Sequence, residues 1–410
     1  MTPPKHSRDS SSRNRWGKPP WSVTFRPRRK ALPDRVDIVI VGGGFAGLSA
    51  AAHVKKYAPG KSVLLLETGK LGNGASGRTG GMALDETAAG PLSGAKKVLA
   101  AYRKILRQLN VQADLSLPGA WEIGRGGGAP SLEGEPKRLT FKKDSPISWF
   151  DSGHLRVVRK VAGGTVDPGK VLTGLARAAQ RAGVHIAEHA EVRSIDFDPL
   201  KLHIASKSGV RSHEHTISAD RVLLAANAGA IDAAALPAGA TPRLTFALAT
   251  APLARAQIAA LGLAHAQPFY TVDLPYLWGR RFAGNRLIFG SGLVPAFGKS
   301  LCPSQMRSKA LWRGLESFDV RRGEPAERLR SLEQRVRALH PVLQRVRITH
   351  RWCGPILITK DWHPIFRSHA KSARVLVLGG FSGHGVALSV FLGRWAAQAL
   401  LGRRAPPQWG

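Results

Sequence analysis

A glycine-rich segment near the start of the chain has the residue types and spacing to hold a diphosphate. Residues 42–47 read Gly-Gly-Gly-Phe-Ala-Gly, so Gly42, Gly44 and Gly47 supply the pattern G-x-G-x-x-G. In a nucleotide-binding turn the first glycine permits a tight bend, the second lets the backbone approach the diphosphate, and the third lets a helix pack closely on a strand. Glu67 follows the last glycine by about 20 residues, where a carboxylate can accept hydrogen bonds from an adenosine ribose.

The elements needed to position these residues flank them in the right order. Residues 36–41 are a short apolar run rich in β-branched residues, residues 48–57 have the composition of a helix, and residues 62–66 form a second apolar run before Glu67. Together they predict a dinucleotide-binding βαβ unit, in which the positive end of the helix dipole faces the diphosphate. An acid at position 67 disfavours the 2′-phosphate of NADP and leaves NAD and FAD as alternatives.

A second group of polar residues lies in the glycine-rich segment 71–81. Ser76, Arg78 and Thr79 stand among its glycines, which disfavour both helix and strand. Backbone amides, two hydroxyls and one guanidinium suit an anion such as a pyrophosphate. We therefore expect an anion-binding cradle here, with a flexible surface loop as the alternative.

The C-terminal region repeats the arrangement of strand, glycine turn and helix. Residues 375–378 form a short apolar run, residues 379–385 read Gly-Gly-Phe-Ser-Gly-His-Gly, and residues 386–401 have helical spacing. The N-terminus of such a helix stabilises negative charge, which reduced flavin carries along one edge of its ring. This second turn favours a flavin over NAD.

Composition limits the classes of function. The chain has 410 residues and a formal net charge of +34, from 61 Lys and Arg against 27 Asp and Glu. Such a charge would attract nucleic acid, acidic lipid or an anionic substrate, and a merely solvated basic surface is the alternative. Neither zinc-finger spacing nor a basic motif interleaved with aromatics is present, so no metal and no specific nucleic acid are expected, while peripheral contact with anionic surfaces stays open.

The cysteine content and the lack of long apolar runs indicate the compartment. Cys302 and Cys353 are too few for a disulfide framework and favour a reducing interior. No apolar run approaches the roughly 20 residues of a membrane span, and the N-terminal segment lacks the apolar stretch of a secretory signal. We expect a cytoplasmic protein whose residues 1–34, rich in Ser, Pro and Arg, form a disordered basic tail.

The order of the expected elements predicts an α/β fold with two domains. Segments 35–85, 166–239 and 351–410 are expected to form a discontinuous Rossmann-like FAD-binding domain, which includes a helix that begins at Pro168 after the N-cap Asp167. Segments 86–165 and 240–350 are expected to form a second, β-rich α+β domain that binds the substrate.

Residues 42–67, 74–81 and 380–385 together resemble the corresponding stretches of the FAD-dependent amine and amino-acid oxidoreductases. This superfamily includes D-amino-acid oxidase, glycine oxidase and sarcosine oxidase. Gly-Ala-Ser-Gly-Arg-Thr-Gly-Gly at 74–81 is most similar to the γ-glutamylputrescine oxidase branch, in which Asn is usual at the position of Thr79. The resemblance implies that Gly42, Gly44, Gly47 and Glu67 hold the ADP part of FAD and that Ser76, Arg78 and Thr79 lie along the diphosphate and flavin. It also implies that Val192 contacts adenine through its backbone and that Gly380, Gly383, His384 and Gly385 line the ring and ribityl chain.

The resemblance implies a reaction as well. A C–H bond next to nitrogen in a small amine or amino acid passes a hydride equivalent to flavin N5, the imine hydrolyses, and oxygen or another acceptor reoxidises the flavin. Alignment and an electrophilic flavin suffice for such a step, so no general base is assigned. His384 is the one catalytic candidate, with a structural histidine as the alternative. Tyr276 and Trp352 are candidates for the substrate pocket, with core aromatics as the alternative.

Two positions depart from the family pattern. Ala387 stands where sarcosine oxidases place a lysine that holds the substrate carboxylate, which disfavours a small N-methyl amino acid. Cys353 lies near the position at which some relatives attach flavin covalently, but out of register with it, so non-covalent FAD is expected. Two other functions remain open from the sequence: an NAD-dependent dehydrogenase, and a non-catalytic basic protein that binds nucleic acid on the same fold.

Overall fold

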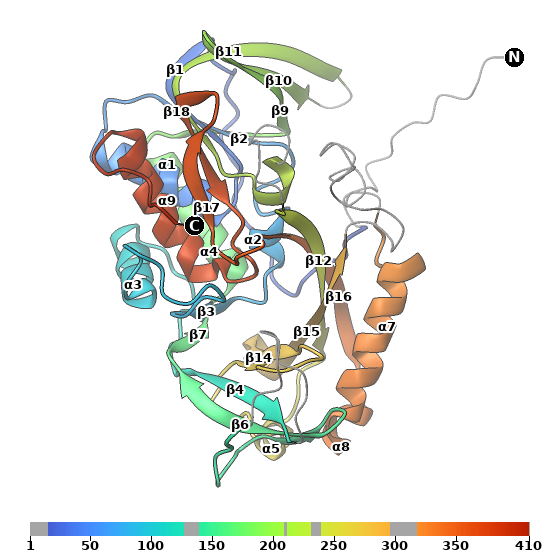
Figure 1. Cartoon of the computed structure of the whole chain (residues 1–410). Coiled ribbons are helices and arrows are strands. Elements are labelled where there is room, and N and C mark those ends of the chain that lie inside the picture. Colours follow the sequence, from blue (N-terminus) through green and yellow to red (C-terminus); the bar gives the residue numbers. More distant parts are fainter. Residues whose placement is uncertain (1–14, 127–138, 209–210, 231–238, 296–317, 410) are drawn as a thin grey trace, which may run out of the picture.

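The computed structural model describes residues 15–126, 139–208, 211–230, 239–295 and 318–409. In that part of the chain two large sheets lie at opposite ends of the molecule (Figure 1). The first sheet has the order β17-β18-β11-β1-β2-β8, and its middle strands pair in parallel. Its parallel strands are β1 (Arg35–Val41), β2 (Val63–Glu67), β8 (His185–Glu188), β11 (Arg211–Leu224) and β18 (Ser372–Gly379).

Antiparallel strands extend the first sheet beside β18 and along the first half of β11. They are β17 (Ile365–His369), which pairs with β18, and the pair β9 (Ala190–Phe197) and β10 (Leu200–Ser208), which joins through β11. Burial on both faces suits the short apolar runs of the parallel strands: Val39, Ile40, Leu64 and Leu65 are fully buried. The predicted Rossmann-like α/β architecture is thereby confirmed.

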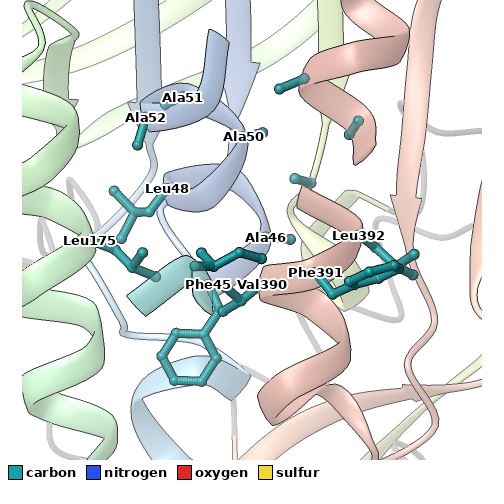
Figure 2. Packing of buried hydrophobic residues seen from close by; sticks show 14 of the residues in the cluster. Phe45, Ala46, Leu48, Ala50, Ala51, Ala52, Leu175, Val390, Phe391 and Leu392 are labelled. Carbon is teal, nitrogen blue, oxygen red and sulfur yellow. The ribbon is translucent and has the colours of Figure 1, made fainter. Parts of the chain in front are cut away.

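Helices cover the first sheet and pack tightly on one another. They are α1 (Phe45–Tyr57), α3 (Val98–Gln108), α4 (Pro168–Arg181) and α9 (Gly385–Leu400). Figure 2 shows α1 between α4 and α9, with Leu48 facing Leu175 and Ala46 facing α9. A Cβ at Gly393 of α9 would lie 2.4 Å from the carbonyl oxygen of Ala46. The small residues of α1 therefore permit a closer approach than a larger side chain would allow.

The second sheet has the order β16-β12-β15-β14-β13-β4-β6-β5, and all its neighbours except β13 and β4 are antiparallel. Its strands are β4 (Ala120–Arg125), β5 (Ser148–Phe150), β6 (His154–Val161), β12 (Thr241–Thr250), β13 (Phe269–Thr271), β14 (Trp278–Phe282), β15 (Arg286–Pro295) and β16 (Ile348–Ile358). The accompanying helices are α5 (Arg255–Ala260), α7 (Gly323–Ala338) and α8 (Pro341–Gln344), and α7 runs along this sheet (Figure 1). A small pair, β3 (Met82–Leu84) with β7 (Gly163–Thr165), completes the described sheets.

At two places the expected domain limits do not coincide with the way the strands and helices pack. Strand β16 pairs with β12 along its whole length, from Ile348 to Ile358, so the limit expected at residue 351 falls inside a strand of the second sheet. Helix α3 was expected in the substrate-binding domain, yet its buried face belongs to the cluster that contains α1 and α9. Both differences arise from long-range contacts, which a local pattern does not record.

Part of the segment expected to be a disordered tail is ordered. Trp16, Trp21 and Phe25 are all buried, and residues 15–34 lie against the body of the protein. This corrects the prediction for those residues, because burial of three large aromatics offsets the entropy lost on ordering the chain. Residues 1–14 lie outside the described residues. Another correction concerns segment 71–81, which contains a short helix, α2 (Ala75–Arg78).

Candidate flavin site

The first glycine turn joins β1 to α1 with the geometry that the motif requires. Gly42 has φ of +115°, and its amide donates to the carbonyl of Leu66 on β2 (2.8 Å). A Cβ at Gly47 would lie 2.0 Å from the carbonyl oxygen of Gly42, so this glycine permits the close packing of α1 on β1. Gly44 is the N-cap of α1, and a Cβ there would lie 2.9 Å from the hydroxyl of Ser76. Each of the three positions thus requires glycine for a separate steric reason.

Glu67 lies at the end of β2 beside this turn. One carboxylate oxygen accepts a hydrogen bond from the Gly43 amide (2.8 Å), and the other accepts one from the Gly69 amide (2.9 Å). Burial raises the pKa of Glu67 above its ordinary value, although these two hydrogen bonds oppose the shift. The carboxylate therefore helps to hold the turn and also lines the adjacent cavity.

The segment 71–81 reaches the same turn through Ser76. The Ser76 hydroxyl accepts a hydrogen bond from the Phe45 amide (3.0 Å), one of the first amides of α1. Such amides have no partner within the helix and attract anions. The hydroxyl of Thr79 accepts from the Gly81 amide (3.4 Å), which keeps Thr79 at the wall of the cavity.

The guanidinium of Arg78 forms its hydrogen bonds with backbone carbonyls. It donates to the backbone carbonyls of Asn73 (3.0 Å), Gly17 (2.8 Å), Trp16 (3.2 Å) and Cys353 (3.4 Å), and it stacks 5.2 Å from the centre of the Trp16 ring. Burial lowers the pKa of Arg78 below its ordinary value. Its hydrogen bonds thus go to neighbouring backbone, and the predicted contact with a diphosphate finds no support in them.

The second glycine turn joins β18 to α9. Gly380 and Gly383 have φ of +64° and +88°, and Ser382 between them has φ of +48°. The Gly380 amide donates to the side chain of Asn227 (2.9 Å). His384 is the N-cap of α9, and its Nδ1 lies 3.1 Å from the carbonyl oxygen of Ser382. Burial lowers the pKa of His384, so the imidazole is neutral at physiological pH.

One cavity of 1780 Å³ connects the two turns, and the N-termini of α1 and α9 both border it. This volume exceeds the range of about 300–1,000 Å³ found for common ligand sites, so it suits a large cofactor together with a substrate. Most of the predicted site residues line it: Gly42, Gly44, Glu67, Ser76, Arg78, Thr79, Val192, Tyr276, Trp352, Gly383, His384 and Gly385. Gly47 and Gly380 do not, because the first packs α1 on β1 and the second lies against Thr359 and Ile365.

A buried hydroxyl at this cavity fits a polar cofactor. Ser389, in the second turn of α9, lines the cavity, and its hydroxyl is buried without a hydrogen-bond partner among the described residues. Buried polar atoms in native proteins almost always have a partner. The glycine turns, the two helix N-termini and this hydroxyl together fit a polar cofactor of the size of FAD.

Residues of the second sheet close the other end of the cavity. Tyr276, Trp278 and Trp352 line it, and the Trp352 indole donates to the carbonyl of Arg78 (2.9 Å). Glu122 of β4 also lines the cavity, and its carboxylate accepts hydrogen bonds from the hydroxyl of Tyr270 (2.7 Å) and from Arg159 (2.5 Å). Sequence reasoning missed Glu122, because a single acid in an apolar strand has no diagnostic spacing.

Cys353 lies behind the cavity wall. Its side chain is fully buried and does not line the cavity. Burial raises the pKa of its thiol to about 12, so it remains a protonated thiol rather than the reactive thiolate. This environment fits FAD bound without a covalent link.

Comparison with known proteins identifies the family. Residues 37–399 match the family model described as FAD dependent oxidoreductase. The chain belongs to this family. It is therefore an FAD-dependent oxidoreductase, and the alternative of an NAD-dependent dehydrogenase is set aside.

The relatives span nearly the whole chain. A probable oxidoreductase, OrdL, of Rhizobium meliloti is 27% identical over 93% of this chain and 88% of its own length. The γ-glutamylputrescine oxidoreductase of Escherichia coli is 24% identical over 89% of this chain and 84% of its own length. Among solved structures, glycine oxidase from Geobacillus kaustophilus superposes with a TM-score of 0.64 at 19% identity, covering 92% of this chain and 97% of that one. The solved structure supports the same fold. Among the described residues, no helix has the length and apolar character needed to cross a membrane.

Proposed function

We propose that the protein oxidises a C–N bond of a small amine or amino acid and passes the electrons to its FAD. The supporting observation is the single cavity, which runs from the nucleotide-binding turn of α1 to a compartment lined by aromatic residues of the second sheet. The names of two relatives, γ-glutamylputrescine oxidoreductase and glycine oxidase, indicate substrates with a C–N bond next to an oxidisable C–H.

Bound FAD supplies a two-electron acceptor for the hydride that leaves the carbon next to nitrogen. The residues of the chain align the substrate and exclude water, and the aromatic residues that line the cavity for this purpose are Tyr276, Trp278 and Trp352. The N-terminus of α9 stabilises the negative charge that develops on the cofactor side. Loss of the hydride from a neutral amine leaves an iminium ion, which releases a proton to give the imine. Water then converts the imine to a carbonyl compound and a free amine or ammonia.

Two titratable groups in the cavity have limited roles in this scheme. His384 is neutral and can orient a polar group through its Nε2, since its Nδ1 already contacts the carbonyl of Ser382. Glu122 accepts hydrogen bonds from the Tyr270 hydroxyl and from Arg159, so both of its carboxylate oxygens already have partners. A carboxylate with both oxygens engaged is better placed to position a polar group of the substrate than to remove a proton from carbon.

An anaerobic reduction screen tests the proposal. The purified protein is mixed without oxygen with primary amines, polyamine derivatives, D-amino acids and N-methyl amino acids. Reduction is followed as loss of the flavin absorbance at about 450 nm. We expect one of these classes to bleach the flavin, with one carbonyl product formed for each flavin reduced. Readmitting air and measuring hydrogen peroxide then distinguishes oxygen from another acceptor. A flavin that no C–N substrate reduces, but that a hydroxy acid does, would refute the proposal.

A further inference from the structure

The ordered N-terminal segment, residues 15–25, crosses the back of the site; we name it the strap. Its first residues extend the edge of the second sheet: Gly17 bridges Trp352 of β16, and the carbonyl of Trp16 accepts from the Cys353 amide (2.9 Å). Further on, the Trp21 indole donates to the carbonyl of Gly77 in α2 (2.7 Å). The Thr24 amide then donates to the hydroxyl of Thr173 in α4 (3.1 Å). The strap therefore ties the second sheet to the helices of the first.

Aromatic contacts place the strap at the cavity itself. Trp21 packs edge-to-face on Trp352, with ring centres 5.6 Å apart, and on Phe282, with ring centres 5.5 Å apart. Trp16, Trp352 and Arg78 all line the cavity that connects the two glycine turns. One part of the cavity wall is thus supplied by the strap rather than by either sheet.

Arg78 is the link between the strap and the cofactor side. Its guanidinium donates to the carbonyls of Trp16 and Gly17 in the strap and to that of Cys353 in β16. No ion pair of Arg78 with a carboxylate is found among the described residues. The hydrogen bonds of this half-buried cation go to backbone carbonyls, and its guanidinium stacks on the Trp16 ring. Its positive charge therefore lies at the wall of the cavity, and desolvation of that charge is unfavourable unless an anion lies near it. The diphosphate of FAD is such an anion.

We propose that the strap is part of the FAD site, with Trp16 as a wall of the bound cofactor and Arg78 as the positioning residue that couples strap docking to FAD binding. Each event then favours the other: the docked strap completes the wall, and the bound anion offsets the charge that holds the strap. This inference rests on FAD binding and not on the identity of the substrate, so its failure would leave the amine or amino-acid chemistry standing.

Limited proteolysis of the unaltered full-length protein tests the coupling. Chymotrypsin cleaves after large apolar side chains, and Trp16, Trp21 and Phe25 are buried only while the strap is docked. We expect saturating FAD to slow cleavage after Trp21 by about tenfold or more relative to the apoprotein, a coupling of ordinary size. Cleavage after Phe150, which is 56% exposed on β5, serves as the internal control and should not change. Equal cleavage after Trp21 with and without FAD would overturn the proposal.

A substitution in the strap tests whether docking of the strap in turn favours FAD binding. Gly17 has φ of +71°, and a Cβ there would lie 2.1 Å from the carbonyl oxygen of Arg351, so Gly17→Val should undock the strap without altering the glycine turns. We expect the Kd for FAD, from equilibrium dialysis, to rise about tenfold or more. Gly402→Val is the matched control, because Gly402 has φ of +68° but no atom within 4 Å of its Cβ position. A Gly17→Val protein with a chymotrypsin-sensitive strap and an unchanged Kd for FAD would contradict the proposal, and the comparison on the unaltered protein decides it if this variant does not fold.

Discussion

Replacing Glu67 with glutamine should weaken FAD binding by a definite amount. The carboxylate now accepts hydrogen bonds from the amides of Gly43 and Gly69, and with FAD present it is expected to accept two more from the adenosine ribose. Hydrogen bonds to a charged acceptor contribute about 1.5–3 kcal/mol and those to a neutral one about 0.5–1.5 kcal/mol, so each ribose bond should lose about 1 kcal/mol. Glu67→Gln should therefore cost about 2 kcal/mol of binding free energy, or roughly 30-fold in the Kd for FAD.

Glu188 provides the matched control for this prediction. It lies opposite Glu67 in the register of β2 and β8, and its carboxylate also accepts a backbone hydrogen bond, from the Leu71 amide (2.8 Å). It does not line the cavity. Glu188→Gln should thus change the Kd for FAD by less than about threefold, which corresponds to well under 1 kcal/mol. Equilibrium dialysis of both apoproteins with FAD measures the difference. If the two variants lose FAD equally, or if Glu67→Gln binds it as the unaltered protein does, the ribose assignment is wrong.

Three further predictions concern the turn, the thiol and a buried histidine. Gly44→Val should give a colourless protein, because its Cβ would lie 2.9 Å from the Ser76 hydroxyl and its methyl groups would occupy the expected path of the diphosphate. Gly60→Val is the control and should stay yellow, because no atom lies within 4 Å of its Cβ position. A yellow, active Gly44→Val enzyme would contradict this prediction. The Cys353→Ala variant should keep its flavin, because the buried thiol is not expected to form a bond with it. Acid denaturation should release all flavin from both the variant and the unaltered protein. Flavin that stays with the denatured unaltered chain would show a covalent bond. Burial lowers the pKa of His53 from 6.5 to about 4, so between these pH values His53 is protonated in the unfolded chain and neutral in the folded one. The free energy of unfolding should therefore fall by about 3 kcal/mol as the pH drops from 6.5 to 4. Urea unfolding at several pH values should show a shallower dependence for His53→Gln, and equal slopes would refute the assignment.

The βαβ unit could be predicted because its information is local. Gly47 is required by a contact within its own turn, because its Cβ would lie 2.0 Å from the carbonyl oxygen of Gly42. The same holds for α4, where Asp167 caps the helix through the Lys170 amide (3.0 Å) as the sequence predicts. Patterns of this kind repeat wherever the same turn is built.

The strap could not be predicted because its information is distant. Trp16, Trp21 and Phe25 stand among Ser, Pro and Arg residues without the period of a helix or strand, and the composition of the segment indicates disorder. Their partners lie far along the chain, in α2, β14 and β16. Large aromatics in a segment of otherwise disordered composition were the one available signal, since such side chains are seldom left in water.

Arg78 shows that a motif predicts the position of a residue in the chain better than the partners of its side chain. The sequence predicts that it lies in an anion-binding segment, and Arg78 does line the cavity, with its Cβ beside Gly354 of β16. Its long side chain donates to two carbonyls of the strap, those of Trp16 and Gly17, and to the carbonyls of Asn73 and Cys353. Because the charge stays within the cavity wall, Arg78 can still act electrostatically on an FAD diphosphate without a direct hydrogen bond. An Arg78→Lys protein would keep that charge but lose the planar fork that spans several carbonyls at once, so it should undock the strap more than it disturbs the attraction for the anion.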